Sequence, residues 1–230
     1  GVGSAGSGVA AQVGGRAGTT GAAGAGGGVG GGYRTLRGEW RGMFPPGRAG
    51  GGLGTEITLS IGFSGPERHL ALRRGEAMVE VEKDAARPFI VTAGGGEAQA
   101  LGTIYAIRMA GSECQVDVEE GVVGVRAAPG SEQQKLLAGQ RLRYADSRFI
   151  ADAEDVNTAA VGAWRRCRLI FNQRPLGDVV ADLQRYRYSR IVITDDRLAA
   201  MPVSGVFDLD DDIATLEMLS RSLPLEAVHW

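Results

Sequence analysis

The sequence is poor in the residues from which metal and catalytic sites are commonly built. Its 230 residues include two histidines, His69 and His229, and two cysteines, Cys114 and Cys167. Neither histidine lies near a cysteine, so the sequence offers no zinc ligand set. The cysteines share no motif; two unpaired thiols are the simpler interpretation, and a disulfide in an oxidising compartment stays open. We expect no metal site and no cofactor.

Charge of one sign and long apolar runs are also lacking. The formal net charge is −2, and acidic residues are interleaved with the arginines. This pattern argues against a nucleic-acid binder, which needs a clustered positive face. No window reaches the roughly 18 consecutive apolar residues that span a bilayer, and no signal-peptide pattern follows Gly1. We therefore expect a fragment or a misplaced start rather than a complete precursor.

Glycine is abundant but unevenly distributed, with 19 of the 37 glycines in the first 50 residues. Residues 1–32 are a low-complexity Gly/Ala stretch that cannot offset its ordering entropy by burial. Residues 33–54 add Trp40, Phe44 and more glycine. The composition predicts a disordered Gly-rich leader over residues 1–54.

From residue 55 the sequence alternates with a period of two. In the run 77–82, Ala77 and Val79 face one way while Met78 and Glu80 face the other, as in a half-buried strand. The same pattern returns in the runs around residues 89–91, 105–109, 114–119 and 142–144. Strands spaced by about 8–12 residues, with Gly or Asp at the turns, are typical of an all-β domain. We predict a sandwich or solenoid-like domain over 55–150.

A small, polar connector over 151–162 precedes a second module with a different period. Pro175 is suited to a helix start, and four apolar residues follow at helical spacing, namely Leu176, Val179, Val180 and Leu183. A second helix over 211–222 has its apolar stripe at Ile213, Leu216 and Leu219. Short strands are predicted at 168–171, 190–194, 203–207 and after Pro224. The order βαββαβ predicts a small α+β domain over 163–230, with both helices on one face of a four-stranded sheet.

The carboxylates do not form a recognisable catalytic pair. Glu119 and Glu120 precede a glycine turn, and the acids of 208–212 lie where a helix dipole favours negative charge. An acid–base pair needs two carboxyl groups that converge in a cleft. The sequence therefore predicts no enzyme.

Residues 64–103 closely resemble the periplasmic part of the FecR family of regulators of iron-siderophore uptake. The corresponding residues are Gly75-Glu76-Ala77, Val79, Val81, Asp84, Arg87-Pro88-Phe89, Val91, Ala100, Gly102 and Thr103, then Val116, Val118, Glu120, Gly121, Val123, Ala138, Gly139 and Leu142. The second module is similar to the family's C-terminal end, itself similar to the short domain of secretins and TonB-dependent receptors. Its matching residues are Trp164-Arg165-Arg166, Pro175-Leu176, Arg185-Tyr186 and the run 203–207. Cys167 stands where the family usually has glycine.

The resemblance implies a periplasmic signalling protein that is anchored in the inner membrane by a helix absent from this chain. It would bind the signalling domain of a TonB-dependent siderophore receptor and control an extracytoplasmic-function sigma factor, through a cytoplasmic domain missing here. No direct small-molecule ligand is expected. The alternative is a carbohydrate- or envelope-binding β domain, although such a binder has no need of the second module.

The second module is the expected partner surface. Its short apolar strands cannot all be central in a small sheet, so one edge can accept a strand of the partner. We name Ile191, Ile193, Val203 and Val206 as the partner-binding residues. The sequence does not say which of the two strands is the edge.

Overall fold

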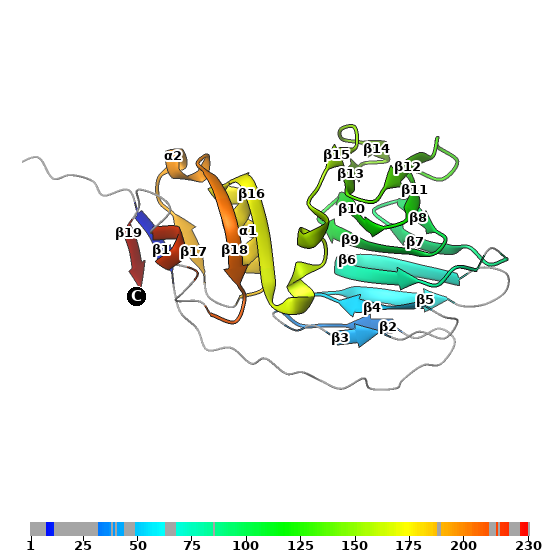
Figure 1. Cartoon of the computed structure of the whole chain (residues 1–230), viewed down its shortest axis with the longest axis horizontal. Helices are drawn as coiled ribbons and strands as arrows, with labels where there is room; N and C mark the ends of the chain where they lie inside the picture. Colours follow the sequence, from blue (N-terminus) through cyan, green and yellow to red (C-terminus); the bar gives the residue numbers. More distant parts are fainter. Residues whose placement is uncertain are drawn as a thin grey trace, which may run out of the picture. The chain divides into compact units, whose positions relative to one another are not determined.

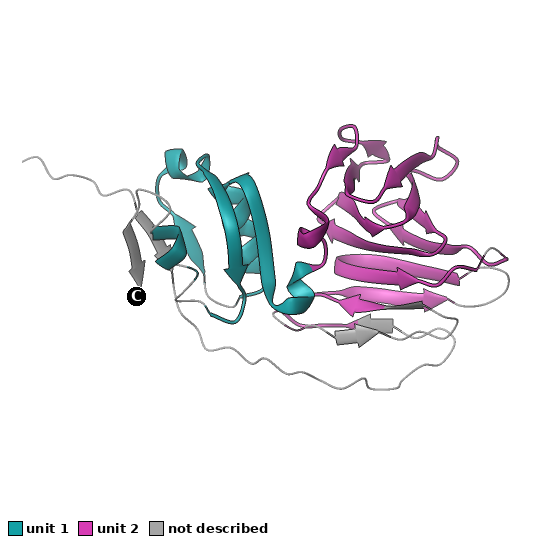
Figure 2. Cartoon of the chain, in the orientation of Figure 1, with its two compact units in different colours: residues 1–18, 163–230 teal, residues 19–162 magenta. Residues whose placement is uncertain are grey.

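A computed structural model describes residues 8–11, 32–37, 39, 41–43, 49–62, 68–84, 86–187, 190–211, 215, 217–220 and 226–229. The chain forms two compact units (Figure 2): unit 1 consists of residues 1–18 and 163–230, and unit 2 of residues 19–162. No helix within the described residues is long and apolar enough to cross a membrane. The chain is mainly β, as its sequence predicts (Figure 1).

Unit 2 is built on one fourteen-stranded sheet, whose main path runs β12-β11-β8-β7-β6-β9-β10-β13-β14. Its elements are β2 (Gly32–Arg34), β3 (Arg41–Met43), β4 (Ala49–Leu53), β5 (Thr58–Gly62), β6 (Arg68–Val81), β7 (Phe89–Ala93), β8 (Gly96–Ala100), β9 (Thr103–Ala110), β10 (Glu113–Glu120), β11 (Val122–Arg126), β12 (Gln134–Leu137), β13 (Gln140–Ala145), β14 (Arg148–Phe149), β15 (Glu154–Asp155) and the 3₁₀ helix η1 (Thr158–Ala160).

Strand β6 joins the two halves of this sheet. Its first part pairs in parallel with β7, and its second part pairs antiparallel with β9. Gly75 separates the two parts with a φ of 89°. A Cβ atom there would lie 2.8 Å from the Cα atom of Ile57, so only glycine allows the chain to turn this closely. The sheet curls around β6 and encloses one core (Figure 1).

The residues predicted to face inward in unit 2 form that core. Side chains from both halves of the sheet are fully buried in a single cluster, including Leu70, Val79, Phe89, Val91, Ile107, Val116, Val125 and Tyr144. The period-two pattern therefore assigned the faces of β6, β7, β9, β10 and β13 correctly, because one face of each strand packs against the core. The predicted all-β domain is confirmed.

The prediction of a disordered leader over 1–54 needs correction for the described residues. Strand β4 pairs with β6, and a Cβ atom on Gly51 would lie 2.0 Å from the carbonyl oxygen of Met78. The buried hydroxyl of Thr35 donates to the Gly54 carbonyl (2.6 Å) and accepts from the Ile57 amide (2.9 Å). Glycine here permits close packing of strands rather than flexibility. Trp40 and Phe44 lie outside the described residues.

Unit 1 contains both helices and strands. They are β1 (Gly8–Ala11), the 3₁₀ helix η2 (Ala163–Arg166), β16 (Arg168–Pro175), α1 (Leu176–Arg185), β17 (Ile191–Ile193), α2 (Asp196–Ala199), β18 (Pro202–Asp208) and β19 (Glu226–His229). Helix α1 begins after Pro175 as predicted, and its four apolar residues at helical spacing are buried. In the predicted helix over 211–222, residues 215 and 217–220 are helical and Leu219 is buried, while Ile213 and Leu216 lie outside the described residues.

The prediction of a single four-stranded sheet for this module is wrong. Strand β16 pairs with β18 in one sheet, and β17, β1 and β19 form another in the order β17-β1-β19. The short helix α2 was not among the predicted elements; Asp195 caps it by accepting a hydrogen bond from the Arg197 amide (2.8 Å). Because α2 separates β17 from β18, these two strands do not form a hairpin. Strand β1 comes from the predicted leader and pairs with both β17 and β19.

Candidate partner interface

Both strands considered as docking edges lie at sheet edges within the described part of unit 1. Strand β18 has β16 as its one partner in a two-stranded sheet, and β17 ends the three-stranded sheet. The sequence left open which of the two strands is an edge, and the order of strands shows that both are. Each offers a row of backbone amide and carbonyl groups that an added strand could pair with.

The four predicted contact residues differ sharply in exposure. Ile191 and Val203 are buried, with 3% and 2% of their surface accessible. Ile193 is half-buried, and Val206 is 47% exposed. Val203 and Val206 are three residues apart, so they point to opposite faces of the strand. Val206 is therefore the residue of this group whose side chain is most available to a partner.

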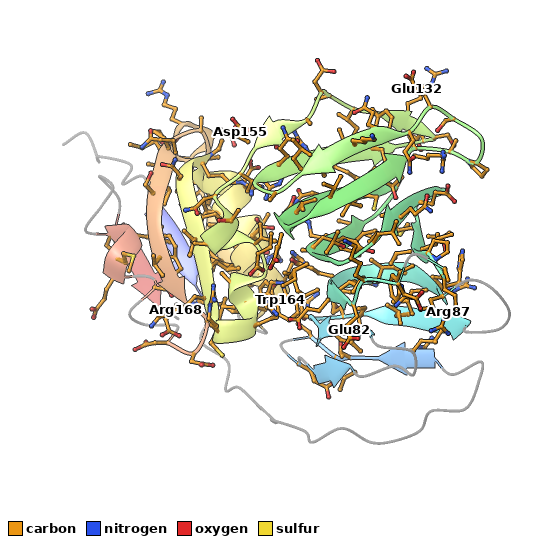
Figure 3. The ribbon with its side chains drawn as sticks, turned by 45° about the vertical axis from the view of Figure 1, so that its right-hand side comes forward. Glu82, Arg87, Glu132, Asp155, Trp164 and Arg168 are labelled. Atoms are coloured by element: carbon orange, nitrogen blue, oxygen red, sulfur yellow. The ribbon has the colours of Figure 1, made fainter. Side chains whose placement is uncertain are left out.

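An outward apolar pair that the sequence did not single out lies on the β16–β18 ribbon. Ile170 stands directly opposite Val206 in the antiparallel register, and Arg168 stands opposite Asp208. Arg168 lies at the start of β16 (Figure 3). The cross-strand neighbour of Val206 could not be named from sequence, because the predicted single sheet did not specify which strand pairs with β18.

Side-chain contacts within the ribbon hold β16 and β18 together. The rings of Phe171 and Phe207 pack edge to face, with centroids 5.5 Å apart. At a bulge between Phe171 and Arg174, the backbone amide and side-chain amide of Gln173 both donate to the Ser204 hydroxyl (2.8 and 3.1 Å). The bulge and the aromatic pair fix β18 from one side, which leaves its other edge and its outer face for contacts.

Helix α1 holds β17 in the same way. The side-chain amide of Gln184 donates to the carbonyl oxygen of Ile191. On the polar side of the helix, Arg174 lies 3.5 Å from Asp182 and 3.8 Å from Asp178. These contacts tie the helix to the strand on each side of it, so the edge strands have a rigid support.

In unit 2 the Arg87-Pro88-Phe89 turn is held by a buried cation. Arg68 is 2% exposed, and its Nε and Nη2 atoms both donate to the carbonyl oxygen of Arg87 (3.1 and 2.9 Å). Its guanidinium lies 5.4 Å from the centroid of the Phe89 ring, a cation–π distance. Burial lowers the pKa of Arg68, which nevertheless stays charged at neutral pH. The turn is thus a structural element.

The other end of the turn is closed by an ion pair. Arg87, labelled in Figure 3, lies 2.9 Å from the Asp84 carboxylate, whose other oxygen accepts from the Ala86 amide (3.1 Å). The hydrogen bond from Arg87 is the main cause of the lowered pKa of Asp84. The spacing of Asp84, Arg87 and Phe89, on which the resemblance rested, therefore has a physical explanation.

Comparison with known proteins agrees with this geometry. Residues 54–124 match the family model described as FecR protein. This segment is a FecR domain. It contains Arg68, the turn at 87–89 that Arg68 holds, and strands β5 to β10. No curated protein matches the chain.

Two crystal structures of a "putative anti-sigma factor from Parabacteroides distasonis ATCC 8503" share the fold of most of this chain. One has a TM-score of 0.71 at 20% identity and covers 86% of this chain and 97% of its own. The other has a TM-score of 0.69 at 21% identity, with 84% and 91% covered. The two-unit architecture, including the part after the FecR domain, thus recurs in a solved structure.

The buried hydroxyls of unit 2 differ in their partners. The Tyr144 hydroxyl donates to the Ala93 carbonyl (2.8 Å), whereas the hydroxyls of Thr103 and Tyr105 have no hydrogen-bond partner among the described residues. Burial raises the pKa of the Cys114 thiol to about 12 and raises the pKa of Tyr105 and of Tyr144. Both cysteines are thiols, not a disulfide. No cluster of three potential metal ligands occurs among the described residues.

Proposed function

We propose that this chain is the periplasmic, signal-sensing part of a FecR-like sigma-factor regulator. Its partner is the signalling domain of a TonB-dependent siderophore receptor, and its output is the activity of an extracytoplasmic-function sigma factor bound by a cytoplasmic domain. The observation that carries the proposal is a FecR domain followed by a separate unit, in whose described part β17 and β18 each lie at a sheet edge. The name of the solved neighbours supports the same class of regulator.

Unit 1 is the receptor-binding unit in this proposal. Val206 and Ile170 form an apolar pair on its outer face, and Ile193 is half-buried on the edge strand β17. An incoming strand would gain backbone hydrogen bonds at the edge and side-chain contacts at alternate residues. Ile191 and Val203 would support this surface from the core rather than contact the partner, because they are buried.

A carbohydrate-binding role has less support from the structure. Glycan sites commonly use exposed aromatic rings, whereas the rings of Phe89, Tyr105 and Tyr144 are fully buried. The partly buried ring of Phe149 also packs against this core.

The test is a binding titration of the receptor signalling domain against the full chain. Val206→Asp should weaken binding by at least about tenfold, since it places an unpaired charge in the contact. Val122→Asp is the matched control, because Val122 is also a strand valine, lies in unit 2 and is 46% exposed. Binding that survives Val206→Asp and is lost with Val122→Asp would overturn the assignment of unit 1. No binding by the full chain would overturn the receptor itself as partner.

A further inference from the structure

The open strand edges described in unit 1 differ in length and regularity. Strand β17 has three residues, and the carbonyl oxygen of Ile191 already accepts from the Gln184 side chain. Strand β18 has seven residues and lies beside β16 (Figure 1). In β16 a bulge with Gln173 at a φ of 51° interrupts the outer edge, as bulges commonly do. Strand β18 therefore presents the longest uninterrupted edge in the described part of this unit.

The hydrogen-bond pattern of the ribbon shows which residues of β18 face its open edge. The Leu209 amide donates to the Cys167 carbonyl at 2.7 Å, and this pair continues the register in which Ile170 stands opposite Val206. Hydrogen-bonded and non-hydrogen-bonded pairs alternate along an antiparallel ladder. Val206, three residues before Leu209, thus belongs to a non-hydrogen-bonded pair. Its backbone amide and carbonyl therefore point away from β16, toward the open edge.

Ser204 repeats this arrangement two residues earlier. Its hydroxyl accepts from the Gln173 backbone amide (2.8 Å), so the bulge is satisfied without the backbone groups of Ser204. At the other end of the strand, the Asp208 carbonyl accepts from the Thr215 hydroxyl (3.0 Å). Ser204 and Val206 therefore offer two amides and two carbonyls to an added strand, and Asp208 marks the end of this edge.

The outer face of the edge is apolar at its centre and acidic at one end. Val206 and Ile170 form a non-hydrogen-bonded pair, the kind in which opposite side chains lie closest. Asp208 follows Val206 by two residues and so lies on the same face. Asp210 and Asp211, just beyond the strand, are also exposed. A partner strand would thus meet an apolar side chain and, two residues along, a carboxylate.

The cation that could offset this charge lies one strand further away. Arg168 stands opposite Asp208, on β16. Neighbouring strands are about 4.8 Å apart, so a strand added to β18 would lie one such spacing from Asp208 and two from Arg168. Because the interaction between charges weakens with distance, the carboxylate dominates at the added strand. A lysine or arginine is therefore favoured beside Asp208.

We propose that the partner adds a strand to β18, with an apolar residue beside Val206 and a lysine or arginine two residues along, beside Asp208. The backbone groups of Ser204 and Val206 fix the register of that strand, and its side chains give specificity. Strand β18, not β17, is then the docking edge. The identity of the partner as a receptor rests on the proposed function, whereas the sequence pattern of its strand rests on β18 alone.

The test uses the capped peptide Thr-Lys-Thr-Val-Thr-Lys-Thr, which is the same in both strand directions, and amide hydrogen exchange of the ¹⁵N-labelled full chain. In the free chain the amides of Ser204 and Val206 should exchange faster than those of Gly205 and Phe207, which bond to β16. The peptide should slow exchange at Ser204 and Val206 in a saturable manner and leave Gly205 and Phe207 unchanged. Slowing at all four amides, or at none with millimolar peptide, would overturn strand addition.

A matched peptide with glutamate in place of both lysines tests the charge preference. The lysine peptide should bind about two- to fivefold more tightly at low salt, as expected for an exposed ion pair. Asp208→Asn should reduce this preference while keeping an acceptor for the Asp210 amide. Asp152→Asn, at an exposed aspartate of unit 2, is the control and should leave the preference unchanged. Equal binding of both peptides, or a full preference in Asp208→Asn, would overturn the proposed pattern.

The peptide experiment and the receptor titration can fail separately. Binding of the receptor signalling domain without slowed exchange at Ser204 and Val206 would overturn strand addition and leave the proposed function standing. Slowed exchange with the peptide, but no binding of the signalling domain, would support β18 as a strand-binding edge and overturn the receptor as its partner.

Discussion

The two units of this chain differ in how their strands are grouped into sheets. In unit 2 the long strand β6 pairs with β4, β5, β7 and β9, and the curled sheet encloses a single core. In unit 1 the strands are divided between a two-stranded and a three-stranded sheet. A two-stranded ribbon is marginal alone, so the pairing of β16 with β18 needs side-chain packing such as that between Phe171 of β16 and Phe207 of β18.

In the proposed function this difference gives each unit its own role. Unit 2 encloses one core and carries the 87–89 turn, which Arg68 holds, although β12 and β14 end its sheet and so also have an open edge among the described residues. Unit 1 keeps strand edges that have no described neighbour, at a site braced by Gln173, Ser204 and Gln184. A partner strand can be added to such an edge without opening a core. The proposed docking surface and the larger core therefore belong to different units of the chain.

The largest effect on stability is expected at the core of unit 2. Phe89→Ala should lower the free energy of unfolding of unit 2 by about 3–5 kcal/mol, because the ring is fully buried and also contacts Arg68. Denaturant unfolding followed by circular dichroism measures the loss. Ile90→Ala is the control, since Ile90 is the next residue and its side chain is half-buried on the other face. Unchanged stability of Phe89→Ala with lost receptor binding would make Phe89 a contact residue instead.

A second substitution tests whether residues 32–37 belong to the frame. Thr35→Val removes a buried hydroxyl that bonds Gly54 and Ile57, and it should cost about 1–3 kcal/mol. Thr92→Val is the matched control, because that hydroxyl is half-buried and makes one longer bond, 3.3 Å to Leu70. If the two variants were equally stable, residues 32–37 would not contribute to the packed core, and the flexible leader that their composition predicts would be correct.

Which features the sequence could predict depends on how local their cause is. The faces of β6 and α1 follow from periods of two and 3.6, which each strand or helix carries within itself. Strand pairing does not: Gly51 is read as flexible from composition, but it fits against Met78, which is 27 residues away. The cross-strand partner of Val206 is likewise set by long-range pairing.

A pH dependence separates the two cysteines. The pKa of Cys114 rises from 9.0 to about 12 on burial, so the folded state keeps the thiol proton while the unfolded state loses it above pH 9. The contribution of Cys114 to the free energy of unfolding is therefore fully present below pH 9. It falls as the pH rises above 9, by up to about 1.4 kcal/mol per pH unit for one group. Thermal unfolding of unit 2 between pH 8 and 10 measures this slope. Cys114→Ala should flatten it, while Cys167→Ala should not; equal slopes in both variants would contradict the assignment.

The smallest predicted effect is a gain of stability in unit 1. Cys167 has a φ of 54°, and its carbonyl accepts a hydrogen bond from the Leu209 amide at 2.7 Å, so its backbone is held in the left-handed region. Glycine, which the family usually has here, adopts this conformation without a Cβ penalty. Cys167→Gly should therefore raise the stability of unit 1 by about 1 kcal/mol. Cys167→Ala removes the thiol but keeps the Cβ atom, so it should show no such gain in the melting temperature of unit 1. Equal gains from both substitutions would mean that removal of the thiol, not of the Cβ atom, causes the effect. A loss of stability with Cys167→Gly would mean that glycine raises the entropy of the unfolded chain by more than it relieves backbone strain in the folded state.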